Sequence, residues 1–132
     1  MKLKNKDMQY YINTYVKATQ NSPIDLNILI LYKIRKNFQN IENAIKPYAD
    51  TLKEIVSKSN GDKSMIEKIN NDINQLGEQE VDVDISEISI SDFGDTKVSP
   101  DFVNSIFFML KDWAFTIGGF YNNGFWSIWH NI

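Results

Sequence analysis

The chain of 132 residues contains no cysteine and only one histidine, His130, two positions from its end. Without cysteine there are no disulfides, no thiol catalysis, no Cys-ligated zinc and no iron–sulfur cluster. The first residues, MKLKNKDMQYY, also lack the apolar stretch of a secretory signal. We therefore expect an intracellular protein.

Residues that could carry catalysis are equally few. His130 has no acid–base partner in the sequence, and the glycines near the C-terminus neither follow a strand nor lead a helix, as a phosphate-binding loop would. Four aspartates could bind a divalent cation, but their spacing does not match a calcium loop, so we interpret them as solvated. They are Asp82, Asp84, Asp92 and Asp95. We expect no enzyme, no cofactor and no metal site.

Charge of either sign is unevenly distributed. Apolar residues make up 42% of the chain and charged residues 23%, as in a folded protein, and the net charge is -3. Residues 1–70 contain 12 Lys+Arg and 7 Asp+Glu, whereas residues 71–132 contain 2 and 10. The negative total argues against direct binding of nucleic acid by the chain as a whole.

Apolar spacing predicts helices over the first half of the chain. A first helix is expected over residues 6–20 with Asn5 as its N-cap, and Ser22-Pro23 marks the start of a second. The second contains a heptad-like seam, interrupted by Pro47, which predicts either a kinked helix or two helices over 23–45 and 47–58. The seam consists of Leu31, Ile34, Phe38, Ile41, Ile45, Tyr48, Leu52 and Ile55.

A turn near residues 57–63 and a helix over 64–76, ended by Gly77, complete an antiparallel helical hairpin. The seam of the long helix can pack on the first and third helices, or it can mediate self-association. The basic side chains of the long helix are interpreted as a solvated surface. They are Lys33, Arg35, Lys36, Lys46 and Lys53.

After this hairpin, the spacing of apolar residues changes from the helical one to every second position. Residues 80–85 alternate as in a half-buried strand, and residues 88–91 alternate in the other phase, which predicts either a bulge or a tight hairpin. Ser99-Pro100-Asp101 begins a last helix that is expected to continue through Trp113.

The expected fold is mainly α (α+β): a long helical hairpin with a kink near Pro47, a short β-strand or β-hairpin element, a C-terminal helix and an aromatic tail. Residues 1–112 form one domain. Residues 113–132 are expected to form an aromatic extension that packs on the domain or on a partner.

Four segments occur in an order that resembles a family of short proteins encoded by tailed phages and prophages of low-GC Gram-positive bacteria. They are MKLKNKDM, KNFQNIENAIKPYADTLKEIV, EVDVDISEISISDF and VSPDFVNSIFFML, and the resemblance spans about residues 1–112. It implies a phage origin and a helical hairpin followed by strands. The family has no assigned activity, so the resemblance transfers no functional residue, and the aromatic tail extends past its usual end.

The segment from Glu78 to Asp95 contains seven carboxylates and no basic residue. Alternate residues of a strand lie roughly 6.5–7 Å apart, about twice the rise per phosphate of one DNA strand. Such a row can occupy a basic channel for nucleic acid, or it can be the solvated face of an edge strand.

Residues 113–132 contain no charged side chain and many aromatic ones. Glycines and asparagines argue against a membrane-spanning helix. The segment can lie at a membrane interface, form a protein-binding hot spot, or complete the core of the domain. The candidate partner-binding residues are Glu78, Glu80, Asp82, Asp84, Glu87, Phe120, Tyr121, Phe125, Trp126 and Trp129.

These observations predict a non-catalytic, phage-encoded protein that binds a host protein, in particular a stoichiometric inhibitor of a nucleoprotein defence complex, as anti-CRISPR proteins are. The alternative is a virion or tail-assembly accessory protein that oligomerises through its helices, for instance as a homodimer. A membrane-active protein is the third hypothesis.

Overall fold

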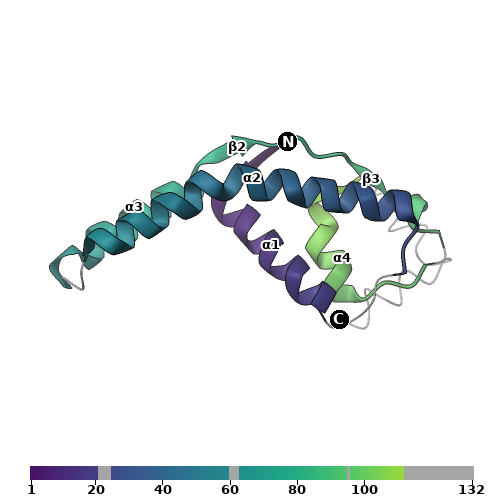
Figure 1. Cartoon of the computed structure of the whole chain (residues 1–132), viewed down its shortest axis with the longest axis horizontal. Helices are drawn as coiled ribbons and strands as arrows, with labels where there is room; N and C mark the ends of the chain where they lie inside the picture. The colour runs from purple at the N-terminus through teal and green to yellow at the C-terminus, as the bar shows by residue number, and fades with distance from the viewer. Residues whose placement is uncertain (21–24, 60–62, 95, 112–132) are drawn as a thin grey trace.

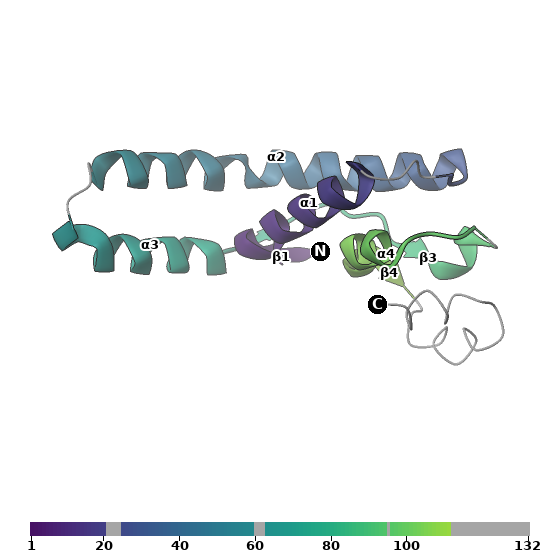
Figure 2. The same cartoon turned by 90° about the horizontal axis from the view of Figure 1, so that it is seen from below.

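The computed structural model describes residues 1–20, 25–59, 63–94 and 96–111. The longest element, α2 (Ile28–Ser59), runs along the whole molecule, and α3 (Ile66–Glu78) returns beside its second half (Figures 1 and 2). The helices α1 (Asn5–Gln20) and α4 (Pro100–Ile106) lie beside the first half of α2. The predicted mainly α fold with a long helical hairpin, short strands and a C-terminal helix is confirmed.

The remaining elements are short. The 3-10 turns are η1 (Lys63–Met65), η2 (Ile90–Phe93) and η3 (Phe107–Met109). The strands are β1 (Lys2–Lys4), β2 (Glu80–Asp82), β3 (Ile88–Ser89) and β4 (Leu110–Lys111).

Pro47 lies inside α2, so the structure has one continuous helix and the alternative of two helices is wrong. The proline is exposed, so water can reach the carbonyl that it leaves without an amide donor. The hydroxyl of Thr51 donates to the carbonyl of Pro47 over 2.7 Å.

The start of α2 lies at Ile28, and the predicted start at Pro23 is therefore too early. The side-chain oxygen of Asn27 accepts a hydrogen bond from the amide of Leu29 over 2.9 Å, as an N-cap does. Ser22 and Pro23 lie outside the described residues.

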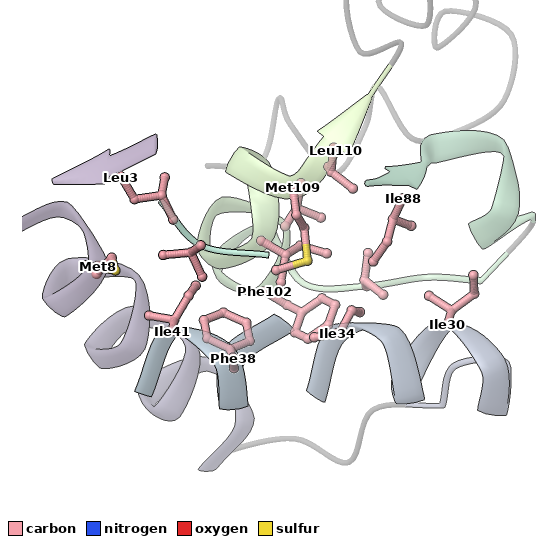
Figure 3. Packing of buried hydrophobic residues seen from close by; sticks show 14 of the residues in the cluster. Leu3, Met8, Ile30, Ile34, Phe38, Ile41, Ile88, Phe102, Met109 and Leu110 are labelled. Carbon is pink, nitrogen blue, oxygen red and sulfur yellow. The ribbon is translucent and has the colours of Figure 1, made fainter. Parts of the chain in front are cut away.

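The middle of the apolar seam of α2 is the core of the protein. Its side chains meet those of α1, α4, β3 and β4 (Figure 3), and the ring of Phe38 stacks on Tyr15 with centroids 4.0 Å apart. Each buried side chain of this size contributes about 1.5–3 kcal/mol. Packing within the chain is confirmed for the buried part of the seam, which comprises Ile34, Phe38, Ile41, Ile45 and Tyr48.

Two predicted helix boundaries are wrong because the start of α1 packs against the end of α3. Asn5 is no N-cap: its Nδ2 donates to the carbonyl of Leu76 over 2.9 Å, and its Oδ1 has no partner among the described residues. Gly77 does not end α3, which continues to Glu78. Gly77 is buried, and a Cβ added to it would lie 3.4 Å from the Cβ of Lys6, an ordinary van der Waals contact.

The strands form two separate sheets. β2 pairs antiparallel with β1, which the sequence analysis missed, and β3 pairs parallel with β4. The phase change at residues 86–87 is therefore neither a bulge nor a hairpin but the place where the chain passes from one sheet to the other.

The last helix is shorter than predicted. The hydroxyl of Ser99 accepts from the amide of Phe102 over 3.2 Å, which confirms the start signal. However, α4 ends at Ile106, because the chain tightens into η3 and then pairs with β3 through Leu110. Trp113 and the rest of the aromatic extension lie outside the described residues.

Candidate functional site

The first turns of α2 present apolar side chains to solvent. Ile28, Leu29 and Tyr32 are 72%, 69% and 62% exposed, the highest values among the large apolar side chains that the structure describes. On the opposite face of the same turns, Ile30 and Ile34 are buried in the core. The helix therefore holds an exposed apolar patch, defined here as Ile28, Leu29 and Tyr32, on a rigid support.

A groove of about 560 Å³ adjoins this apolar patch. One wall is α2, and the other is formed by the chain that leads from β2 through η2. The groove is open to solvent, and both apolar and charged side chains line it. The lining residues are Asn27, Leu29, Ile30, Tyr32, Lys33, Lys36, Ser86 and Asp92.

Hydrogen bonds from α2 fix the second wall. The side chain of Asn37 is 1% exposed; its Nδ2 donates to the carbonyl of Ser86 over 2.9 Å, and its Oδ1 accepts from the amide of Ser86 over 2.9 Å. Asn40 donates to the carbonyl of Asp84 over 2.9 Å. These bonds hold Asp84 and Ser86 against α2, although residues 84–87 belong to none of the described strands.

The turn η2 places Asp92 at the groove. Ile90 and Phe93 anchor the turn in the core, whereas Asp92 is exposed. Gly94 follows with φ 57° and ψ -131°, a conformation that side chains disfavour, and its amide donates to the carbonyl of Ser91 over 3.2 Å. A glycine at this position lets the chain turn away directly after the groove.

The charge along the groove is predominantly positive. Lys33, Arg35 and Lys36 lie in the first turns of α2, and no carboxylate occurs between residues 26 and 41. Lys33 and Lys36 form no salt bridge with any residue in the described ranges. The sequence analysis interpreted these lysines as solvated helix surface; they are exposed, and they also line a groove.

The acidic residues predicted to bind a partner are all exposed, but basic groups lie beside several of them. Glu78 ends α3, Glu80 and Asp82 lie on β2, and Asp84 and Glu87 follow β2. In the pairing of β1 with β2, lysines stand opposite the acids of β2: Lys2 faces Asp82, and Lys4 faces Glu80.

Two of these acids are also bound directly. Glu78 accepts hydrogen bonds from Lys4, over 2.7 Å, and from Lys6. These bonds lower the pKa of Glu78 to about 2, and the bond to Glu78 raises the pKa of Lys4. The Met1 ammonium lies 3.2 Å from Asp82 Oδ1. Glu80, Asp84 and Glu87 form no salt bridge within the described part of the chain.

The five aromatic candidates Phe120, Tyr121, Phe125, Trp126 and Trp129 lie outside the described residues, as does His130. In the ranges that the structure covers, no three His, Asp or Glu side chains are placed to hold a metal ion. None of the helices described here is long and apolar enough to cross a bilayer.

One sequence signal could have revealed the groove. In the stretch LNILILY, residues 26–32, every position except Asn27 is apolar. A helix that is apolar on all sides must either be buried completely or expose an apolar face, and this one exposes the patch. The sequence analysis considered only the seam beginning at Leu31.

We compared the chain with protein-family models, with curated proteins and with solved structures, and none of the three comparisons gave a match.

Proposed function

We propose that this protein is a non-catalytic binding protein of phage origin that acts stoichiometrically on a host protein, as an inhibitor of a nucleoprotein defence complex in the host cytoplasm. The observation that carries the proposal is the apolar patch of α2 beside the groove. Contiguous exposed apolar side chains rimmed by polar ones are typical of protein-binding surfaces, where a few aromatic and aliphatic anchors supply most of the affinity.

Two further features support an interaction role. The patch lies on a helix whose opposite face is buried, so binding needs little ordering of the chain. Asp84 and Glu87, which form no salt bridge in the described part, lie on the segment that forms the far wall of the groove. The resemblance of residues 1–112 to phage proteins suggests the host as the source of the target.

The test is affinity capture from host lysate followed by titration of the captured nuclease or CRISPR component. The double variant Leu29→Ser/Tyr32→Ser is compared with Tyr10→Ser/Ile66→Ser, which removes exposed side chains of similar type elsewhere. We expect the patch variant to lose roughly tenfold or more in affinity, because hot-spot anchors each contribute about 1–2 kcal/mol or more. The matched variant should behave as the parent protein.

Inhibition that is complete at one protein per target would support the stoichiometric mechanism. Equal recovery with both double variants would contradict a role for the patch. A chain truncated after Asp112 tests the aromatic extension as a binding surface. A charge reversal at Glu80, Asp84 and Glu87 tests the acidic segment in the same way.

A second function, a virion or tail-assembly component, is favoured by the arm, defined here as residues 50–59 of α2, η1 and residues 66–73 of α3. The arm projects past α1 (Figure 2), and its apolar side chains are half-buried or exposed. They are Leu52, Ile55, Val56, Met65, Ile66, Ile69 and Ile73. Light scattering that gives a dimer or larger assembly, together with co-purification with phage particles, would support this alternative over the first.

A further inference from the structure

We infer that the groove receives an apolar segment of a partner protein that also carries carboxylates, an inference that rests on the proposed function and specifies its partner. The groove joins an apolar surface to Lys33 and Lys36, which form no salt bridge within the described ranges, and the occupant must match both features. The chemistry of the partner therefore follows from three properties of the lining.

The first property is the apolar surface along α2. Leu29 and Tyr32 are exposed, and Ile30, which is buried in the core, also lines the groove. An aliphatic or aromatic side chain from a partner would exclude water from Leu29 and Tyr32, and burial of this apolar surface favours binding.

The second property is the charge. Lys33 and Lys36 lie one turn apart in the lining and form no salt bridge among the described residues. Of the lining residues that the structure describes, Asp92 is the one acid. Carboxylates on the partner would be attracted to the two lysines, whereas a partner segment with basic side chains would be repelled by them. A polyanion such as nucleic acid fits less well, because the apolar patch offers it no phosphate contact.

The third property is the shape. The groove has a volume of about 560 Å³. This lies within the range of roughly 300–1,000 Å³ that is typical of ligand sites. A concave site takes up a projecting segment better than a flat lipid surface, so a peptide segment is favoured over an anionic membrane.

The test uses the full chain, labelled with ¹⁵N, and two synthetic amphipathic peptides of equal length. The peptides share the same Leu and Phe positions and carry either Glu or Lys at the polar positions. We expect the Glu peptide to shift the amides of residues 27–36, 86 and 92 and to bind at least about fivefold more tightly than the Lys peptide, with a ratio that falls in high salt.

The variant Lys33→Glu/Lys36→Glu should abolish or invert this preference. The matched variant Lys46→Glu/Lys53→Glu has the same charge change on exposed positions of the same helix and should preserve it.

Equal affinity for both peptides, no shift of the groove amides at saturating peptide, or tighter binding to phosphatidylglycerol vesicles than to the Glu peptide would each overturn the inference. A failure of this inference can be distinguished from a failure of the proposed function. If the peptides bind equally but capture of the host protein still depends on Leu29 and Tyr32, only the charge inference is wrong.

Discussion

The far wall of the groove depends on one buried side chain, Asn37. It holds the amide and the carbonyl of Ser86 through two hydrogen bonds of 2.9 Å, and its Nδ2 also lies 3.3 Å from the sulfur of Met109. We predict that Asn37→Ala destabilises the protein by about 2–3 kcal/mol, because each lost hydrogen bond costs about 0.5–1.5 kcal/mol and the truncation removes packed atoms as well.

The matched control is Asn40→Ala. Asn40 also links α2 to the same segment, but through a single bond to the carbonyl of Asp84, and its side chain is only half-buried. We expect this change to cost about 0.5–1 kcal/mol, because water replaces a lost partner at an accessible site.

Urea unfolding followed by circular dichroism measures both variants. For a protein of this size the slope is about 1–3 kcal/mol per molar urea, so a loss of about 2–3 kcal/mol in Asn37→Ala should lower the midpoint by roughly 0.7–3 M. It should also weaken peptide binding to the groove, since Ser86 is part of the lining. Equal midpoints for Asn37→Ala and Asn40→Ala would refute the reasoning that Asn37 fixes this wall.

Three further predictions concern single residues. Gly94→Ala should lower the free energy of unfolding by about 1–3 kcal/mol, because alanine disfavours the positive φ of 57°; an unchanged melting temperature would contradict this. Ser99→Ala should cost about 1 kcal/mol through loss of the α4 cap, measured by urea unfolding, and a stabilised variant would argue against the cap. The pKa of Glu78 is lowered to about 2 from 4.5, so its stabilisation is complete above pH 4.5 and disappears as the pH falls through about 2. The stability difference between the parent protein and Glu78→Gln should therefore shrink over this interval, and a difference independent of pH would show that the lysine contacts do not stabilise the fold.

The elements that local periodicity specifies were predictable. The seam from Ile34 to Tyr48 repeats at helical spacing because one face of α2 is buried, and the Ser99 cap is a local signal that the structure retains. The alternation from Glu80 to Asp84 is also correct, with Val81 and Val83 turned inward.

The errors arise where contacts between distant segments override local signals. Lys2–Lys4 is too short to be recognised as a strand and forms one only because Glu80–Asp82 lies beside it. Glycine is a common helix stop, but α3 continues past Gly77 to Glu78, where the start of α1 packs against it. The helix starting at Pro100 ends early because Leu110 pairs with Ile88, a parallel pairing that no local pattern indicates.

Only part of the candidate site could be predicted from the sequence. The positions of the acidic residues on an exposed face were predicted, but the lysines of β1 opposite them were not, because that pairing joins residues 2–4 to residues 80–82, far apart in the sequence. The groove was missed because its two walls are separated by about fifty residues and are joined by side-chain hydrogen bonds of Asn37 and Asn40.

The central claim is that the apolar patch of α2 and its groove bind the target. Hydroxyl-radical footprinting of the complex with the captured host protein tests this most directly, because it reports side-chain accessibility. We expect strong protection of Leu29 and Tyr32, whereas Tyr10, which is exposed on α1, should be unaffected. Protection confined to the arm or to the strand pair β1–β2, with Leu29 and Tyr32 oxidised as in the free protein, would contradict it.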